Sequence, residues 1–469
     1  MIVPLELPTR SNPARYTQGG TARLVNCFME QIGREGKTQT AIYAVDGLQG
    51  FAATPDANGP IRSMLPVGTY LYYVAGTSLY RVTESGVVSH LGAMSISATA
   101  PVYMARNRRA TPDVAIVCDG LMYYYRTSLS QVTDVDLLAP TSLSVVDGMF
   151  VIGTANNTWQ VGEIDDASAW DGLSFERADA NPDAVVVVSA RQNEAVIFGE
   201  QSCEFWQDAG MADGSGFARS GVMDLGCVAM GSVAPVDQTL AWVASDRTVR
   251  LLAGYQGTRI SSHAVERDIE DLTDRTTIRA TSWVKDGHTF YSITSANWTW
   301  VYDTVTSEWH NRVSYGQSNW RVSEVVAFAG TLIAGDASNG NLYEMSANYM
   351  DEAGAPLVSS VTFSPTTAFP HRLTFHRLWF DVEVGVGTGQ GAGEDVDPHL
   401  MLEWSDDGGA TFKAQRRMPL GGQGKRLTRV QTARLGQCRP QGRVFRLSCS
   451  ARVARAIYQA QAEIERDAA

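Results

Sequence analysis

A short motif recurs seven times along this chain: an apolar strand, a turn of small residues, and a second strand that begins on an aromatic or apolar pair. Measured between equivalent positions, the successive steps are 43, 36, 46, 45, 52 and 41 residues. The equivalent positions are Tyr80, Tyr123, Trp159, Phe205, Arg250, Tyr302 and Tyr343. A period of about 44 residues is typical of one four-stranded propeller blade. The sequence therefore predicts an all-β protein built on a β-propeller of six or seven blades.

Radial packing explains how such a repeat becomes stable. A single small sheet leaves both faces exposed, whereas blades arranged around an axis bury each other's faces and leave only short edges. The aromatic residues of the repeat, including those of 298–309, are therefore expected in the cores of the blades. Asn339 and Gly340 stand between two apolar strands, and this dipeptide predicts a two-residue type I′ hairpin because both residues tolerate positive φ.

The chain divides into three parts. Residues 1–42 are rich in Pro, Gly, Asn and Thr without helical or strand periodicity, so we expect an irregular N-terminal arm. Residues 43–350 hold the repeats and should form the propeller. From residue 351, longer alternating strands predict a separate antiparallel β-sandwich over residues 351–469. Within it, residues 451–465 are rich in alanine, but their alternation with polar side chains predicts a strand.

Composition fits a large β-protein with much covered surface. Only 19% of the 469 residues are charged, below the usual quarter, as expected where neighbouring sheets or subunits cover the surface. The longest apolar run, around residues 185–188, is far shorter than the about 20 residues of a membrane-spanning helix. Residues 1–8 lack the basic and apolar regions of a signal peptide. We therefore expect no membrane insertion, and synthesis in the cytoplasm.

Neither a metal site nor a cofactor site is indicated. The six cysteines are scattered without ligand spacing, which predicts buried thiols, with a disulfide between Cys438 and Cys449 as the alternative. Residues 33–38 end like a phosphate-binding loop, but Gln31 stands where its first glycine belongs. The glycine-rich residues 385–393 lead into carboxylates rather than a helix, so they predict a hairpin tip, with weak calcium binding as the alternative.

No catalytic set can be assembled from the sequence. Residues 405–412 match the Asp-box turn of sialidase propellers, but this box occurs once and outside the repeats. A glycosidase needs two carboxylates opposed across a cleft, which adjacent Asp406 and Asp407 on a turn cannot supply. We therefore expect a protein that is not an enzyme.

Several segments occur in an order that is known from one protein family. Residues 24–30 carry an Asn-aromatic-x-Glu element, and a Gly-Leu-x-x-Phe turn follows at 47–51, with Asp46 where proline is usual. Residues 194–206, 216–231 and 301–309 and the turn at 405–408 continue the same order. Over nearly its whole length the chain thus resembles the packaged-DNA stabilisation proteins of short-tailed phages.

The resemblance implies a structural protein of the virion tail, made in the host bacterial cytoplasm. In that family the protein forms a six-fold ring, the tail hub or nozzle, which extends the channel below the portal and its adaptor ring. The implied partners are other copies in a homohexamer, the adaptor and portal, tail needle, tip or fibre proteins, and the packaged DNA that the ring helps to retain and deliver. The alternative is a carbohydrate-binding or sialidase-like β-propeller, which would need an Arg cluster with Tyr and Glu around the propeller axis.

Charge is divided unevenly along the chain. Residues 413–455 contain twelve basic residues and no acidic residue, although the whole chain has a net charge of −12. Three interpretations are open: side chains that face acidic parts of the propeller or solvent, a docking surface for a neighbouring subunit or the adaptor, and contact with DNA. The candidate docking residues are Arg416, Arg417, Lys425, Arg426 and Arg429.

Overall fold

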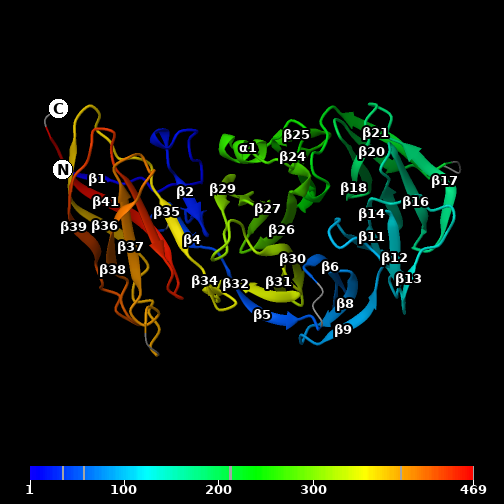
Figure 1. Ribbon diagram of the computed structural model, residues 1–469, viewed down its shortest axis with the longest axis horizontal. Coiled ribbons are helices and arrows are strands. Elements are labelled where there is room, and N and C mark those ends of the chain that lie inside the picture. Colours follow the sequence, from blue (N-terminus) through cyan, green and yellow to red (C-terminus); the bar gives the residue numbers. More distant parts are fainter. Residues whose placement is uncertain (34–35, 56–58, 211–213, 391–392, 468–469) are drawn as a thin grey trace.

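The computed structural model describes residues 1–467 apart from 34–35, 56–58, 211–213 and 391–392. The described chain is almost entirely β-structure. It has one α-helix, α1 (His263–Glu270), and three short 3₁₀ helices, η1 (Thr17–Gly19), η2 (Met230–Ser232) and η3 (Arg275–Thr277). A propeller and a sandwich lie side by side along the longest axis of the molecule (Figure 1). The predicted all-β fold with these two components is confirmed.

Seven four-stranded antiparallel blades form the propeller. Blade 1 is β6 (Ile61–Val67), β7 (Tyr70–Ala75), β8 (Ser78–Thr83) and β9 (Val88–Ala93). Blade 2 is β10 (Tyr103–Arg106), β11 (Val114–Cys118), β12 (Leu121–Tyr125) and β13 (Leu129–Gln131). Blade 3 is β14 (Ser142–Val146), β15 (Met149–Gly153), β16 (Thr158–Ile164) and β17 (Trp170–Arg177). Blade 4 is β18 (Val185–Arg191), β19 (Glu194–Gly199), β20 (Cys203–Asp208) and β21 (Phe217–Met223).

The remaining three blades complete the ring. Blade 5 is β22 (Ala234–Val236), β23 (Thr239–Val243), β24 (Val249–Ala253) and β25 (Gln256–Arg259). Blade 6 is β26 (Arg279–Lys285), β27 (His288–Thr294), β28 (Thr299–Asp303) and β29 (Glu308–Asn311). Blade 7 is β30 (Val322–Phe328), β31 (Thr331–Asp336), β32 (Asn341–Ser346) and, from the start of the chain, β5 (Gly47–Ala53).

The sequence repeat corresponds to the third strand of every blade. Its seven equivalent positions lie on β8, β12, β16, β20, β24, β28 and β32. Six of these positions are aromatic residues that are buried in blade cores, and the seventh, Arg250, is half-buried. The predicted blade period is therefore confirmed, and the number of blades is seven.

Strand β5 closes the ring. It pairs antiparallel with β32 as the outermost strand of blade 7, so the beginning and the end of the propeller segment share one sheet. Blade 7 then packs against blade 1 through their innermost strands, β30 and β6. This closure leaves no blade with an uncovered face.

Side-chain oxygens link innermost strands of neighbouring blades. Each accepts a hydrogen bond from a backbone N–H of the next blade, which satisfies a donor that its own sheet leaves free. The bonds run from Val188 N to Ser142 Oγ (3.0 Å), from Val325 N to Thr281 Oγ1 (2.9 Å), and from Met64 N to Glu324 Oε2 (2.7 Å).

The hairpin between β31 and β32 is present, but its predicted turn type is wrong. Residues 337–340 form a four-residue loop, and neither Asn339 nor Gly340 has a positive φ. Asp336 explains the difference, because its Oδ1 accepts hydrogen bonds from the backbone N and Oγ of Ser338 at 2.8 and 2.6 Å. That side chain organises the loop in place of a two-residue turn.

The sandwich consists of two sheets that enclose one hydrophobic core. The first sheet contains β3 (Cys27–Gln31), β4 (Thr40–Ala44), β41 (Ala456–Arg466), β36 (Leu373–Val382) and β39 (Val430–Gln437), with β1 (Ile2–Pro4) beside β41. The second contains β2 (Arg23–Val25), β35 (Ser359–Thr362), β40 (Val444–Cys449), β37 (His399–Ser405) and β38 (Lys413–Pro419). Strands β33 (Asp351–Glu352) and β34 (Ala355–Pro356) lead into it from blade 7. The strand predicted in residues 451–465 is confirmed as β41.

Residues 1–42 differ from the predicted irregular arm. They contribute β1, β2, β3 and the start of β4 to the sandwich, joined by irregular segments. These strands are three to five residues long, too short for an alternation to stand out in the sequence. Strand β2 pairs with β35, and β1 and β4 pair with β41, so these partners lie more than 300 positions away in the chain.

Asn26 fastens the propeller to the sandwich. Strand β2 pairs in parallel with β29, so the second sandwich sheet continues into blade 6. The buried Asn26 has a φ of 53°. Its Nδ2 donates to Val313 O and Val358 O, both at 2.9 Å, and its Oδ1 accepts from Val313 N at 2.9 Å. One side chain thus joins the N-terminal strands, the end of blade 6 and the entry to the sandwich.

Candidate functional site

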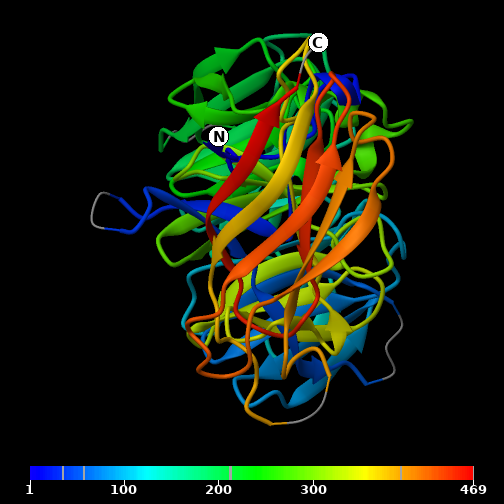
Figure 2. The same cartoon turned by 90° about the vertical axis from the view of Figure 1, so that its left-hand side faces the viewer.

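All five predicted docking residues lie on one side of the sandwich, and all five are exposed. Arg416 and Arg417 belong to β38, an edge strand of one sheet, and Arg429 directly precedes β39, an edge strand of the other. Lys425 and Arg426 lie in the loop 420–429, which joins these two edges. Figure 2 shows this end of the molecule facing the viewer. The fold therefore brings these basic side chains together at one side of the sandwich, whereas the sequence shows only that they follow one another along the chain.

The loop 420–429 holds its tip away from the sandwich. Gly424 has a φ of 78°, in the region that favours glycine, and its N–H donates to Gly385 O at 3.1 Å. Thr428 Oγ1 donates to Lys425 O at 2.7 Å. Leu427, between these anchors, is 96% exposed. The loop thus presents an apolar side chain surrounded by basic ones.

Few carboxylates neutralise the five candidate residues. Arg417 Nη2 lies 2.8 Å from Glu394 Oε1, and Arg426 Nη1 lies 3.9 Å from Glu383 Oε1. Within the described residues, the charged nitrogens of the other three candidates have no carboxylate oxygen within 4.0 Å. Most of this positive charge is therefore available to a partner.

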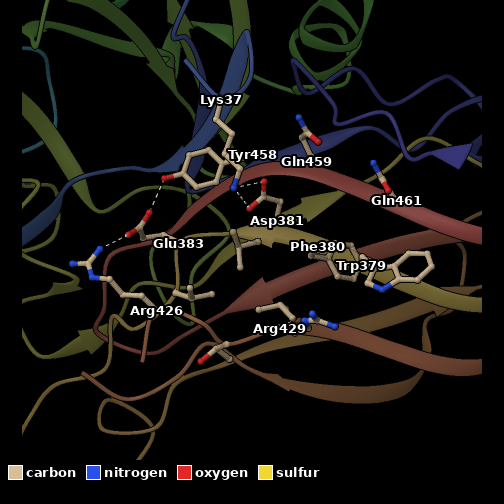
Figure 3. Close-up of a pocket in the computed structure, with 14 residues that line it drawn as sticks. Lys37, Trp379, Phe380, Asp381, Glu383, Arg426, Arg429, Tyr458, Gln459 and Gln461 are labelled. Atoms are coloured by element: carbon tan, nitrogen blue, oxygen red, sulfur yellow. Dashed lines mark hydrogen bonds and ion pairs between the residues drawn. The ribbon is translucent and has the colours of Figure 1, made fainter. Parts of the chain in front are cut away.

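Two of the candidates, Arg426 and Arg429, also line a groove of about 640 Å³ over β36 and β41 (Figure 3). Its other charged groups are paired internally. Lys37 Nζ lies 2.5 Å from Asp381, and Tyr458 Oη donates to Glu383 Oε2 at 2.8 Å. Burial, together with that bond, raises the pKa of Tyr458 above its ordinary value. The other polar and aromatic lining residues include Trp379, Gln459 and Gln461.

Other basic residues of the 413–455 run serve the sandwich itself. Arg443 is 2% exposed, and its Nε and Nη2 lie 2.6 and 3.0 Å from the two carboxylate oxygens of Asp406. Arg446 Nη2 lies 2.7 Å from Glu403, and Arg455 Nη1 donates to Leu357 O at 2.7 Å. These residues therefore pair with groups of the sandwich itself, a contact that none of the three interpretations included, and the docking interpretation concerns the exposed residues.

One residue of the run contacts the segment that leads from blade 7 into the sandwich. Arg452 Nε lies 3.1 Å from Asp351 on β33, which pairs with the closing strand β5 of blade 7. Arg452 thus pairs with a carboxylate at the entry to the sandwich, beside the last blade.

The two aspartates of the Asp-box turn are expected to respond differently to substitution. Asp406→Ala leaves the buried Arg443 guanidinium without its bidentate partner and should lower the free energy of unfolding of the sandwich by about 2 to 3 kcal/mol. Asp407 accepts from Ser405 Oγ at 2.6 Å and from Thr411 N at 2.9 Å, and these bonds hold its pKa well below the ordinary value. Asp407→Ala should only loosen the turn, seen as faster hydrogen exchange at Thr411. Equal loss of stability in urea unfolding of both variants would contradict this assignment.

The axis of the propeller encloses a cavity of about 410 Å³ that contains the residue types of the alternative function. Arg62, Arg279, Tyr103 and Glu324 are among its lining residues. Arg62 Nη1 donates to Gly76 O at 2.8 Å, so this guanidinium serves its own blade. The Tyr103 hydroxyl is buried without a hydrogen-bond partner among the described residues, and burial raises its pKa. Among the described residues, Glu324 is the single carboxylate in the lining, and no second one opposes it.

Glu324 should make the stability of the propeller depend on pH. Burial raises the pKa of Glu324 to about 7 in the folded protein, from an ordinary value near 4.5. The stabilisation that protonation gives is complete below about pH 4.5 and is lost as the pH rises through 7. Glu324→Gln keeps an acceptor for Met64 N and should raise the free energy of unfolding at pH 8 by about 3 kcal/mol while leaving it unchanged at pH 4. Melting curves of the wild-type protein and the variant at pH 4 and pH 8 would test this. An equal difference in Tm between the two proteins at both pH values would contradict it.

A cluster of titratable side chains between blade 6 and β3 was not predicted from the sequence. His288 Nδ1 lies 2.8 Å from Asp303 Oδ2, and its Nε2 lies 4.0 Å from Glu30. Burial lowers the pKa of His310 to about 3 and that of Arg312 to about 10. Because Glu30 comes from far away in the chain, no local motif signals this cluster. Its enclosed volume of about 50 Å³ suits fixed packing of the junction.

The structure also shows the segments that were weighed as possible metal or nucleotide motifs. Within the described residues, no group of three or more His, Cys, Asp or Glu side chains is placed to hold a metal ion. All six cysteines are free and buried, as predicted. In the loop 385–397, Glu394 pairs with Arg417 and Asp395 accepts from Arg452 N at 2.7 Å, while residues 391–392 lie outside the described part. Of the phosphate-loop-like segment 33–38, residues 34–35 lie outside it too.

No helix among the described residues is long and apolar enough to cross a membrane.

Solved structures that resemble this chain include the following two, both at low identity. The computationally designed Ika8 protein aligns with a TM-score of 0.40 and 13% identity over 63% of this chain and 99% of its own. The extracellular domain of a putative one component system, BT4673 from B. thetaiotaomicron, aligns with a TM-score of 0.45 and 8% identity over 70% of this chain and 43% of its own. A search of curated proteins finds no match.

Two family models match the chain directly. The β-propeller of bacteriophage P22 Gp10 matches residues 24–350, and the β-sandwich of the same protein matches residues 370–465. Together these matches span the seven blades and most of the sandwich. The chain therefore belongs to the bacteriophage P22 Gp10 family of packaged-DNA stabilisation proteins and is a structural phage protein.

Proposed function

We propose that the protein is a tail hub, or nozzle: a ring of six copies that extends the DNA channel below the portal and adaptor and helps to retain and deliver the genome. In this proposal it is made in the host cytoplasm and incorporated into the virion tail. The adaptor lies on one side of the ring, tail needle, tip or fibre proteins lie on the other, and the DNA passes through.

The grouping of the five candidate residues on one exposed side of the sandwich is the observation that carries the proposal. Three of them have no carboxylate within 4.0 Å among the described residues, so this surface offers uncompensated charge. Arginine forms bidentate, orientation-fixing pairs with carboxylates, as a subunit or adaptor contact requires. Exposed side chains on two edge strands also leave the core unaffected when a partner binds.

Net charge favours passage of the genome over tight DNA binding. Each copy carries a net charge of −12, so a ring of several copies repels the phosphate backbone on average. A channel lined with phosphate-binding arginines would instead hold DNA through many salt-sensitive contacts and slow its release. Retention in this proposal comes from plugging and closing the channel together with the partner proteins.

We further propose that the propeller is not catalytic. A carbohydrate-binding or sialidase-like propeller is the second candidate, and the Arg, Tyr and Glu residues at the axis are the observation that favours it. Against it stand the buried hydroxyl of Tyr103 and the engagement of Arg62 by backbone carbonyls. Hydrolysis of sialosides by purified protein, lost in both Arg279→Ala and Glu324→Gln, would establish the second candidate. No hydrolysis and no glycan binding are expected.

Negative-stain imaging with and without the adaptor ring tests the main proposal. We expect rings on the adaptor, with the sandwich in contact with a neighbouring subunit or the adaptor. Single particles that never associate with adaptor rings at any ratio would contradict it.

A further inference from the structure

The two most exposed large apolar side chains in the described part of the chain lie at opposite ends of the molecule. Leu427 is 96% exposed in the loop between β38 and β39, and Val135 is 95% exposed in the loop between β13 and β14. The sandwich strands β38 and β39 occupy one end of the longest axis, and blade 3 with β17 occupies the other (Figure 1). Each apolar side chain stands within a cluster of charges, and the two clusters have opposite signs.

The first cluster, which we call the basic loop, consists of Lys425, Arg426, Leu427 and Arg429. Hydrogen bonds from Gly424 N to Gly385 O and from Thr428 Oγ1 to Lys425 O, at 3.1 and 2.7 Å, fix its shape. Leu427 is therefore held out by a defined loop and is not covered by its neighbours.

The second cluster belongs to the most acidic part of the chain. Residues 130–183, which include blade 3, contain ten acidic residues and one basic residue. Some of these carboxylates are paired within the molecule, such as Asp147 with Arg108 at 3.0 Å and Asp179 with Arg219 at 2.9 Å. Within the described residues, Asp136 and Asp171 have no basic nitrogen within 4.0 Å.

A buried glutamine holds this second cluster together. Gln160, fully buried, donates from Nε2 to Asp136 O at 2.8 Å and to Asp171 O at 3.1 Å. Its Oε1 accepts from Leu138 N at 2.9 Å. The Asp136 carboxylate lies so close to Gly172 on β17 that a Cβ there would meet Oδ1 at 2.8 Å. The cluster, which we call the acidic edge, consists of Val135, Asp136, Leu138, Asp171 and Leu173.

We propose that the basic loop of one copy docks on the acidic edge of the next copy. The proposal rests on the ring of the proposed function and names its subunit contact. Two different, complementary patches at opposite ends of one molecule generate a head-to-tail interface, which closes into a ring when the rotation between copies allows it. Leu427 supplies an apolar anchor for the exposed Val135 and Leu173, and the surrounding charges orient the approach.

Charge complementarity selects a second copy as the partner. Both halves of the contact, a basic loop and an acidic edge, are present on this one chain. Because each patch has an exposed apolar centre within charges of a single sign, two basic loops or two acidic edges would repel each other. That repulsion opposes any dimer in which like patches meet and favours contact between unlike patches, as in the repeating arrangement.

Paired cysteines test the contact in the full-length protein. Val135→Cys with Leu427→Cys, placed in tails assembled with the adaptor, should give a ladder of covalent multimers on non-reducing gels after mild oxidation or treatment with a short bis-maleimide. The six native cysteines are buried and should not react. Each single variant should stay monomeric on the gel. Val87→Cys with Leu427→Cys is the matched control, because Val87 is 60% exposed but lies on blade 1.

Charge exchange provides the second readout. Asp136→Lys with Asp171→Lys should reduce the amount of ring formed at least tenfold. Lys425→Glu with Arg426→Glu should reduce it to the same extent, and the variant with all four changes should restore ring formation. Multi-copy tails without a Val135–Leu427 cross-link and without rescue would overturn this contact and leave the ring intact as a proposal. Tails that contain a single copy of wild-type protein would instead overturn the proposed function itself.

Discussion

Reversal of four basic side chains, Arg416, Arg417, Lys425 and Arg426, to glutamate should leave each copy folded but weaken assembly onto the preceding tail ring by at least about tenfold. All four side chains are exposed, and the two ion pairs that they make are exposed as well. Such pairs contribute about 0 to 1 kcal/mol each, so the fold should survive. Circular dichroism would check folding, and co-sedimentation with the adaptor ring would measure assembly.

The control carries the same change of charge elsewhere. Arg15, Arg106, Arg377 and Arg466 are exposed and lie outside the docking surface, and their reversal should leave assembly unchanged. If the docking variant assembles normally but the virion loses its genome, these residues contact DNA. Normal assembly with normal genome retention would mean that they only face solvent.

Asn26→Ala should reduce the free energy of unfolding by about 3 to 5 kcal/mol. The substitution leaves Val313 N, Val313 O and Val358 O without their partner in a buried junction, and it places alanine at a φ of 53°. Because this junction joins propeller and sandwich, we expect the two parts to unfold separately. Urea unfolding followed by tryptophan fluorescence, together with limited proteolysis near residue 358, would detect this.

Two further variants separate the causes of that loss. Asn26→Gly removes the same hydrogen bonds but accepts the positive φ, so it should be less damaging by about 1 kcal/mol. Asn26→Asp keeps the acceptor for Val313 N and loses both donors. Unchanged stability in Asn26→Ala would show that the junction does not depend on this side chain.

The repeat made the propeller predictable, because the third strand of six of the seven blades carries a buried aromatic residue such as Trp159 or Phe205, at a spacing of about 44 residues. The closing strand β5 was not predictable in the same way. It completes blade 7 from a position almost 300 residues earlier, and pairing at that distance leaves no local periodicity. The short strands β1 to β3 were not predicted for a related reason, because three to five residues show too little alternation of apolar and polar side chains.

The candidate site was predictable in part. The basic run identified residues that the structure gathers on two edge strands and one loop, but it did not separate exposed Arg416 from buried Arg443, whose partner Asp406 lies in another turn. The burial of Arg443 depends on the pairing of β37 with β40, and a count of charges along the sequence does not reveal this pairing. The acidic character of residues 130–183 was present in the sequence, and a count of charges blade by blade would have found it. The position of this acidic segment at the far end of the molecule could be known only from the structure.

The number of copies of this chain in one assembled tail tests the account most directly. Native mass spectrometry or calibrated imaging should be applied to tails, since a monomer in isolation is compatible with a ring that assembles only on its adaptor. The account predicts a closed ring of six copies. A single copy per tail would contradict it.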